Sequence, residues 1–331
     1  MSTSPVISVT DTSLGDDDLE RVLAEETGAE YRRAGGDGEL GAALDDADVV
    51  FTNLVTLGAQ ELRRLADGAV VIRYGVGVDN VDLDAAAAAG VRVCNVPDYG
   101  ANVVADHAVT LATMLVRRVR DFDAALHRGE EPAADAFGAI PSLESRTVGL
   151  VGAGRIAQLT AARFHAFGCR TLAFDPFADA AALAEHDITL VPWERLLAES
   201  DLISLHAPLT GETRHLLDDD AFAAMRRGVH VINTARGALI DTAALLRALD
   251  EGIVAGAALD VTDPEPLPKN APLRARPEVI LTPHVAFYSA ESMQRLQQLA
   301  VAEGRRALAG EPLRCPVPLP TAPAPDQEGP V

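Results

Sequence analysis

Three residues in the second half of the chain, Arg236, Glu265 and His284, have types and positions that can do chemistry. Each lies at or just beyond the end of a short apolar run that is typical of a buried strand. The runs span 229–233, 256–261 and 279–282. Because ligands of an open parallel sheet bind at the carboxyl ends of its strands, we expect the three side chains to share one cleft. That cleft would contain an anion-binding guanidinium, an imidazole for proton transfer and a carboxylate that tunes the imidazole.

Upstream, the apolar run Thr147–Val151 leads into a glycine-rich turn, Gly152-Ala-Gly154-Arg-Ile-Ala157, and a helical pattern follows. Gly152 permits the tight turn, and Gly154 lets the backbone approach a pyrophosphate. The N-terminus of the helix attracts the phosphates. Strand, glycine-rich turn and helix in this order predict a dinucleotide-binding fold.

The next predicted strand, 170–174, ends in Asp175. A carboxylate that binds the adenosine ribose is expected about twenty residues after the glycine-rich turn, which is where Asp175 stands. Asp175 would repel a 2′-phosphate, and the following Pro176 and Phe177 offer no arginine to accept one. The predicted cofactor is therefore NAD rather than NADP.

The chain has 331 residues, enough for two domains that each bury a core. Its formal net charge of -21 argues against binding to nucleic acid, which requires a basic face, and against binding to an anionic membrane surface. We interpret the charge as a solvated acidic surface.

No apolar stretch reaches the length of about eighteen residues that a membrane span requires. Residues 1–6 lack the basic start and apolar core of a signal peptide, so a cytoplasmic location is expected. Cys94, Cys169 and Cys315 are odd in number and widely spaced, which favours neither a disulfide framework nor a zinc site. No metal site is predicted.

Strands and helices alternate in two series. The first has apolar runs at Val6–Val9, Val49–Thr52, Val70–Arg73 and 91–96, with helical patterns at 14–23, 60–66 and 83–89. This series predicts a small parallel α/β domain. A long helix at 102–120 and a loop at 128–146 precede the second series, which supplies about seven strands from Thr147 to Thr282. An amphipathic helix at 289–308 and a proline-rich tail follow.

With these motifs in place, the chain resembles the D-isomer-specific 2-hydroxyacid dehydrogenases, a family with phosphoglycerate, glyoxylate and phosphite-oxidising members. The resemblance covers residues 70–315, and His284-Val-Ala-Phe-Tyr-Ser289 is most similar to the branch with the C-terminal-binding-protein corepressors and phosphoglycerate dehydrogenase-like proteins. The motifs that carry it begin at Gly75, Asn95, Val104, Gly149, His206, Asn233, Ala258, Glu265 and Thr282.

The resemblance implies an α/β fold of two doubly wound parallel-sheet domains. A Rossmann NAD-binding domain, 98–285, would be inserted into a flavodoxin-like substrate domain made of 1–97 and 286–315. Residues 316–331 are expected to form a disordered proline-rich tail. The resemblance also implies a homodimer held largely through the NAD-binding domains.

The chemistry of the three polar residues agrees with this family. A 2-oxo acid presents a carboxylate beside a ketone, and Arg236 can bind both while it polarises the carbonyl. His284 would donate a proton to the ketone oxygen as hydride arrives from the nicotinamide. Glu265 would orient the imidazole and raise the pKa of His284 by stabilising its charged form.

The remaining site residues complete a substrate set and a cofactor set. Arg73 and the backbone amides of Val76 and Gly77 would hold the acid group of the substrate from the other domain, and closure of the domains would bring both halves together. By resemblance, Asp260 would contact the nicotinamide carboxamide, and His206 would lie along the cofactor rather than transfer a proton. The predicted substrate residues are Arg73, Val76, Gly77, Arg236, His284 and Phe287; the predicted cofactor residues are Gly152, Gly154, Arg155, Ile156, Asp175, His206, Ala207, Pro208, Thr213, Thr234, Ala235, Asp260 and His284.

Each residue alone also has an ordinary structural interpretation. An arginine after a strand is most often a surface charge, a glutamate among prolines a loop acid, and a histidine after proline a strand cap. Their combination with the nucleotide turn favours catalysis. His107, on the long helix, is interpreted as a packed or interface residue because no metal-binding set surrounds it.

The predicted function is NAD-dependent hydride transfer between the nicotinamide and a small 2-hydroxy or 2-oxo acid. Phosphite is a poor candidate, since Val76 stands where phosphite-oxidising relatives carry lysine. Two alternatives stay open: a dehydrogenase of a small phosphonate alcohol or aldehyde, because two arginines can hold either anion, and an NAD(H)-sensing scaffold like the corepressors.

Overall fold

The computed structural model describes residues 4–11, 16–35 and 39–320. These residues divide into two compact units. Unit 1 lies within Met1–Gly100 and Ser289–Val331, and unit 2 is Ala101–Tyr288. The chain enters unit 2 at 100/101 and leaves it at 288/289, where the sequence analysis placed 97/98 and 285/286. Unit 2 is therefore continuous in sequence, whereas unit 1 is assembled from two separate segments.

Unit 1 contains a five-stranded parallel sheet with the order β2-β1-β3-β4-β5. Three of its strands, β1, β3 and β4, are short apolar runs that are buried on both faces, as parallel strands covered by helices must be. The order 2-1-3-4-5 is that of flavodoxin-like sheets, so this part of the predicted fold class is confirmed. The strands are β1 Val6–Val9, β2 Glu30–Arg33, β3 Val49–Thr52, β4 Val70–Arg73 and β5 Arg92–Asn95.

The sequence analysis did not identify β2. Its sequence, Glu-Tyr-Arg-Arg, contains no apolar run because β2 lies at the edge of the described sheet. It pairs there with β1, from Val6 opposite Glu30 to Val9 opposite Arg33. Tyr31 supplies its inward contact and donates a hydrogen bond to Asp17. Polar edge strands of this kind escape a search for hydrophobic periodicity.

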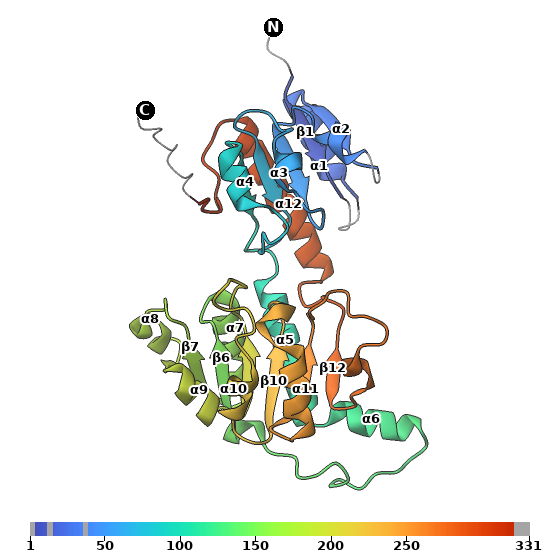
Figure 1. Ribbon diagram of the computed structural model, residues 1–331, viewed down its shortest axis with the longest axis vertical. Helices are drawn as coiled ribbons and strands as arrows, with labels where there is room; N and C mark the ends of the chain where they lie inside the picture. The colour runs from blue at the N-terminus through green and yellow to red at the C-terminus, as the bar shows by residue number, and fades with distance from the viewer. Residues whose placement is uncertain (1–3, 12–15, 36–38, 321–331) are drawn as a thin grey trace, which may run out of the picture. The chain divides into compact units, whose positions relative to one another are not determined.

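Helices cover both faces of the unit 1 sheet (Figure 1). On one face, residues such as Leu23 and Leu296 of two helices pack with Phe51 of β3. On the other face, Leu44, Leu62 and Ala86 of three further helices pack with the opposite side of the strands. The first pair is α1 Asp18–Thr27 and α12 Ala290–Leu308; the other three are α2 Leu40–Leu44, α3 Ala59–Leu62 and α4 Leu83–Ala88.

Unit 2 contains a seven-stranded parallel sheet with the order β12-β11-β10-β9-β6-β7-β8. Counted within the unit, this is the order 3-2-1-4-5-6 of Rossmann folds with one further strand, which confirms the other half of the predicted fold class. The strand order reverses between β6 and β9, the place where dinucleotides bind in such sheets. The strands are β6 Thr147–Val151, β7 Arg170–Phe174, β8 Ile188–Leu190, β9 Leu202–Leu205, β10 Val229–Asn233, β11 Val254–Leu259 and β12 Val279–Leu281.

Two hydrophobic cores lie on the two faces of this sheet (Figure 1). One contains residues of α5, α7 and α8, and the other contains residues of α9, α10 and α11. None of the helices in the described residues is long and apolar enough to span a membrane. The helices are α5 Ala101–Val116, α6 Val119–His127, α7 Arg155–Ala166, α8 Ala180–Ala184, α9 Trp193–Glu199, α10 Asp219–Ala223 and α11 Thr242–Asp250, with 3-10 turns at Leu143–Ser145, Gly237–Leu239 and Pro272–Ala275.

The single helix predicted at 102–120 is two helices, so this prediction was wrong in its C-terminal part. Arg118 separates α5 from α6. Its backbone is in the left-handed region, with φ 54°. A left-handed residue cannot continue a right-handed helix, so the chain changes direction at this point. The apolar periodicity continues across Arg118, which is why the sequence alone did not show the break.

The proline-rich tail begins against the unit 1 sheet. Pro316 forms an isolated antiparallel bridge with Cys94 of β5, and the Val317 amide donates to the Val93 carbonyl at 2.8 Å. Val317 and Leu319 also pack against the core beneath α3 and α4. The rest of the segment predicted to be disordered, 321–331, lies outside the described residues.

Candidate active site

The three polar residues follow neighbouring strands of the unit 2 sheet. Arg236 comes after β10, Glu265 after β11 and His284 after β12, and these strands pair side by side in parallel. Their carboxyl ends therefore lie at one edge of the sheet, as the sequence analysis expected.

Glu265 and His284 are in direct contact. The His284 Nδ1 atom lies 2.5 Å from Glu265 Oε1. An ionised carboxylate only accepts hydrogen bonds, so Nδ1 carries the proton and Nε2 is left to face a substrate. Each side chain is 42% exposed, so both can be reached from solvent. Partial burial raises the pKa of Glu265, but the hydrogen bond and charge of His284, with the charge of Arg236, outweigh it and hold this pKa below its usual value.

The Arg236 loop is fixed by a buried amide. Asn233, at the end of β10, is fully buried; its Nδ2 donates to the Arg236 carbonyl at 2.8 Å, and its Oδ1 accepts from the Ala235 amide at 3.0 Å. Next to it, a Cβ on Gly237 would lie 2.0 Å from the Thr262 carbonyl carbon, so only glycine fits there. This close approach joins the Arg236 loop to the loop that carries Glu265.

The His284 loop is fixed by a buried carboxylate. Asp260 accepts hydrogen bonds from the Val285 and Ala286 amides, each at 2.9 Å, and its carbonyl accepts from the His284 amide at 2.7 Å. These bonds hold His284 at φ 53°, a left-handed conformation that costs a non-glycine residue about 1 kcal/mol or more. The contact of Asp260 with the nicotinamide carboxamide stays a prediction. The structure shows that Asp260 directly follows β11 and bonds the backbone of residues 284–286.

The glycine-rich turn has the geometry of an anion site. Gly152 has φ 90°, and a Cβ there would lie 2.9 Å from the Ala207 nitrogen. Helix α7 begins after Gly154 with no side-chain cap, and the N-terminus of a helix is a favourable place for an anion. Asp175 accepts from the Ala153 amide at 2.9 Å, so its carboxylate lies against this turn.

These residues fit a dinucleotide. The Thr234 hydroxyl, in the predicted cofactor set, is buried and has no hydrogen-bond partner among the described residues. A buried hydroxyl without a partner is costly, and a bound ligand would satisfy it. The uncapped α7 amides offer a phosphate site, and Asp175 offers a carboxylate for a ribose hydroxyl.

His206 follows β9 and has a different character from His284. Burial lowers the pKa of His206 to about 4, so the imidazole is uncharged at neutral pH. Its Nε2 lies 2.9 Å from the Ser204 hydroxyl. An imidazole of this pKa carries no proton for general acid catalysis near neutrality, in agreement with the role predicted for it along the cofactor.

Comparison with known proteins decides the family. Residues 109–286, more than half of the chain, match the model of the "D-isomer specific 2-hydroxyacid dehydrogenase, NAD binding domain". The chain belongs to this family. Within it, unit 2 corresponds to the NAD-binding domain, and NAD is the cofactor that its residues fit.

Three relatives show the extent of the similarity. The D-3-phosphoglycerate dehydrogenase of Mycobacterium leprae is 39% identical over 276 residues, which cover 82% of this chain and 51% of that protein. The glyoxylate reductase of Thermofilum pendens is 38% identical over 251 residues, 73% of this chain and 72% of that protein. The structure of an Aquifex aeolicus D-lactate dehydrogenase with NAD and lactic acid has a TM-score of 0.82 at 26% identity, covering 92% of this chain and 96% of that one. The chain thus spans about half the length of the phosphoglycerate dehydrogenases that it matches.

The predicted substrate residues of this family member belong to both units. Phe287 lies beside His284 in unit 2, with ring centroids 6.0 Å apart in an edge-to-face arrangement. In unit 1, the Val96 amide donates to the Gly75 carbonyl at 2.9 Å, and Asn95 Nδ2 donates to the Val76 carbonyl at 2.6 Å. These carbonyl groups turn toward β5, and the N–H of a trans peptide points opposite its carbonyl, so the amides of Val76 and Gly77 are directed away from β5. Arg73 is the last residue of β4, immediately before this loop.

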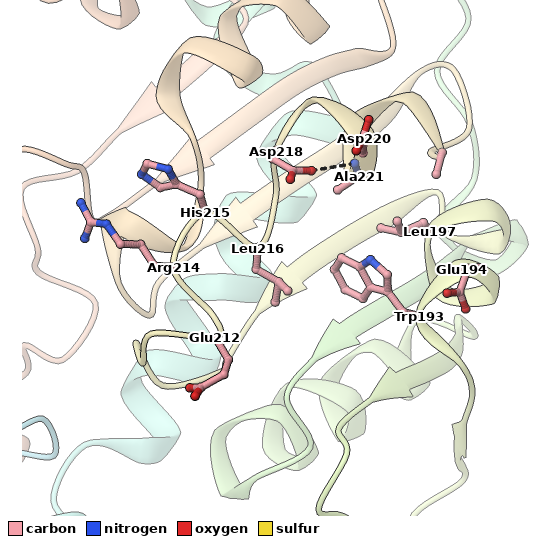
Figure 2. Close-up of a pocket in the computed structure, with 11 residues that line it drawn as sticks. Trp193, Glu194, Leu197, Glu212, Arg214, His215, Leu216, Asp218, Asp220 and Ala221 are labelled. Atoms are coloured by element: carbon pink, nitrogen blue, oxygen red, sulfur yellow. Dashed lines mark hydrogen bonds between the residues drawn. The ribbon is translucent and has the colours of Figure 1, made fainter.

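A pocket of about 480 Å³ in unit 2 was not predicted (Figure 2). Trp193, Leu197 and Leu216 contribute apolar surface, and several acids stand around them. The pocket borders the turn of Thr213, whose hydroxyl donates to the Pro208 carbonyl at 2.7 Å, but Arg236, Glu265 and His284 do not line it. Its lining comes from α9, α10 and the loop between β9 and α10, so no single stretch of sequence indicates it.

Sequence reasoning also missed the residues that position the site. Asn233 and Thr282 were noted only as the first residues of motifs, although Asn233 donates to the Arg236 carbonyl and Thr282 donates to Asp260. Their polar side chains at strand ends were the available signal, because a buried polar group must find a partner.

Proposed function

We propose that this protein is an NAD-dependent oxidoreductase that transfers hydride between the nicotinamide and a small 2-hydroxy or 2-oxo acid. The observation that carries the proposal is the contact of 2.5 Å between Glu265 and His284, in the unit that also contains the uncapped nucleotide turn. Family membership supports the same reaction class.

In the proposed reaction, NAD(H) supplies or accepts the hydride. His284 Nε2 donates a proton to the ketone oxygen during reduction and removes a proton from the hydroxyl group during oxidation. Glu265 holds the protonated Nδ1 of His284 and compensates the positive charge of the imidazolium. Arg236 binds the carboxylate and stabilises negative charge on the carbonyl oxygen.

We also propose that Arg73 and the amides of Val76 and Gly77 bind the acid group of the substrate. Two observations in unit 1 support this proposal. Arg73 is the last residue of β4, and the carbonyl groups of Gly75 and Val76 in the following loop accept hydrogen bonds from residues 95 and 96. Phe287 supplies an apolar wall beside His284. Asp175 would favour NAD over NADP, since its carboxylate already faces the nucleotide turn and would repel a 2′-phosphate.

An NADH oxidation assay across a panel of 2-oxo acids and phosphonate aldehydes tests the proposal. We expect turnover with at least one 2-oxo acid and a clear preference for NADH over NADPH. Turnover confined to phosphonates would select that alternative, and NADH binding without turnover of any compound would favour the scaffold. A homodimer and a cytoplasmic location stay predictions; sedimentation of the full chain would test the first.

A further inference from the structure

His107 of α5 contacts Thr282, the residue that directly follows strand β12 of the unit 2 sheet. Its Nε2 atom lies 3.2 Å from the Thr282 hydroxyl, across 175 residues of sequence. The same hydroxyl lies 2.5 Å from Asp260 Oδ1, and His107 Nε2 is 3.6 Å from that oxygen. Three side chains from α5, the end of β12 and the end of β11 therefore form one connected group.

The chemistry of the three groups fixes the direction of these bonds. The Asp260 carboxylate accepts, so the single hydroxyl proton of Thr282 is donated to it. The Thr282 oxygen can then only accept from His107, whose proton must be on Nε2. The result is a chain of donors that runs from His107 through Thr282 to Asp260, and such chains strengthen each member by polarisation.

The chain ends on the residue that shapes the His284 loop. Asp260 Oδ1 receives both the Thr282 hydroxyl and the Val285 amide, and Oδ2 receives the Ala286 amide. The Asp260 side chain has no exposed surface, so these donors stand in for solvent. Its orientation decides where the two amides, and with them the left-handed His284, are held.

We propose that His107 is a positioning residue for His284, acting through Thr282 and Asp260. This inference rests on the proposed acid/base role of His284 for its kinetic part, but not for its structural part. His107 does not touch His284; it limits the positions that Asp260 and the 284–286 backbone can adopt.

A second histidine offers a matched control. His165 of α7 lies 2.7 Å from the Thr171 hydroxyl, which donates to the Asp187 carbonyl at 3.2 Å. This is the same order of groups in the same unit, but it ends on a backbone carbonyl in another loop. If His107 were only a packing residue, His107→Leu and His165→Leu would have similar consequences.

The experiment compares His107→Leu, His107→Gln, Thr282→Val and His165→Leu in the full chain. The first readout is amide hydrogen exchange at Val285 and Ala286, which requires no substrate. We expect exchange at these amides to become about fivefold faster in His107→Leu and Thr282→Val, the effect of losing one hydrogen bond. His107→Gln keeps an N–H donor and should restore most of the protection, and His165→Leu should leave it unchanged.

The second readout is steady-state kinetics with NADH and the best 2-oxo acid. We expect kcat to fall about fivefold in His107→Leu with little change in NADH affinity, and the His107→Leu/Thr282→Val double variant to be no worse than the poorer single variant. Unchanged exchange at Val285 and Ala286, additive losses, or an equal effect of His165→Leu would overturn the proposal. A wild-type protein without turnover would overturn the proposed function instead. The exchange rates at Val285 and Ala286 would still test whether His107 positions the His284 backbone.

Discussion

The two units are both doubly wound parallel sheets, yet they hold the loops at their strand ends differently. In unit 2, the loops that carry Arg236 and His284 are fixed by the buried side chains of Asn233 and Asp260. In unit 1, the loop after Arg73 is held through its carbonyl groups, which leaves backbone amides directed elsewhere. Reacting groups need fixed orientation, whereas groups that bind an anion need available donors. We therefore expect unit 2 to determine the rate of the chemical step and unit 1 to determine the affinity for the substrate.

The strongest test of this division is His284→Gln in unit 2. Removing the general acid should lower kcat by about a thousandfold, with little change in NADH affinity. Steady-state kinetics and NADH titration measure both quantities. Tyr288→Phe is the matched control, since Tyr288 is 63% exposed and close in sequence but has no proposed proton-transfer role. Activity of His284→Gln within tenfold of the parent protein would refute the acid/base assignment.

Arg236→Lys should have the next largest effect. Lysine keeps the charge but loses the planar fork that can bind a carboxylate and a carbonyl together, so kcat/KM should fall roughly a hundredfold. Arg247→Lys is the control, because Arg247 forms a surface ion pair with Asp219 on α10. An equal loss in both variants would point to a general effect of arginine replacement rather than to the site.

Arg73→Gln addresses unit 1. If this unit mainly supplies affinity, KM for the 2-oxo acid should rise about tenfold while kcat changes by a small factor, the pattern for loss of uniform binding. Steady-state kinetics with NADH and the 2-oxo acid provide both KM and kcat. A fall in the kcat of Arg73→Gln that is larger than the rise in its KM would break the division between the units.

The smallest expected effect concerns acid stability. Burial, together with the charges of Arg118 and Arg146, lowers the pKa of His230 to about 4, and burial lowers that of His206 to about 4 as well. The unfolded chain binds these protons near pH 6.5, so the stability of unit 2 should be complete above that pH and fall as the pH drops toward 4. In unit 1, burial raises the pKa of Glu20. The contribution of Glu20 to the free energy of unfolding therefore has the opposite pH dependence to that of the two histidines, because it is lost as the pH rises.

Urea unfolding at several pH values measures this difference. Trp193, the single tryptophan of the chain, lies in unit 2 and reports its unfolding by fluorescence. Between pH 6.5 and 4, the free energy of unfolding of His230→Asn should fall by on the order of 1 kcal/mol less than that of the parent protein. An unchanged slope would show that His230 does not titrate differently on folding.

Much of the fold could be predicted because its central strands are apolar runs that end in motif residues. Thr147–Val151 and Val70–Arg73 were placed correctly for this reason. The edge strand β2 and the break at Arg118 were not, because neither a polar edge strand nor a left-handed arginine leaves a periodic signal. These features depend on tertiary contacts rather than on local pattern.

The site shows the same limit. The types of Arg236, Glu265 and His284 indicated the chemistry, and their strand-end positions indicated that the loops would meet. The sequence could not show that Asn233 holds the Arg236 loop, or that His107 reaches Thr282 from a helix 175 residues earlier. Contacts between distant residues are set by packing, which a single sequence does not reveal.

The two crossings of the chain at 100/101 and 288/289 also set the order in which the protein can fold during its synthesis. The core of unit 1 combines Leu23 and Phe51 with Leu296 and Ala300 of α12, which leaves the ribosome after all the helices of unit 2. Unit 2 is complete before α12 emerges, since a nascent chain folds domain by domain. The first hundred residues therefore wait with α1 on this face of their sheet but with the surface that α12 later covers, including part of Phe51, still exposed.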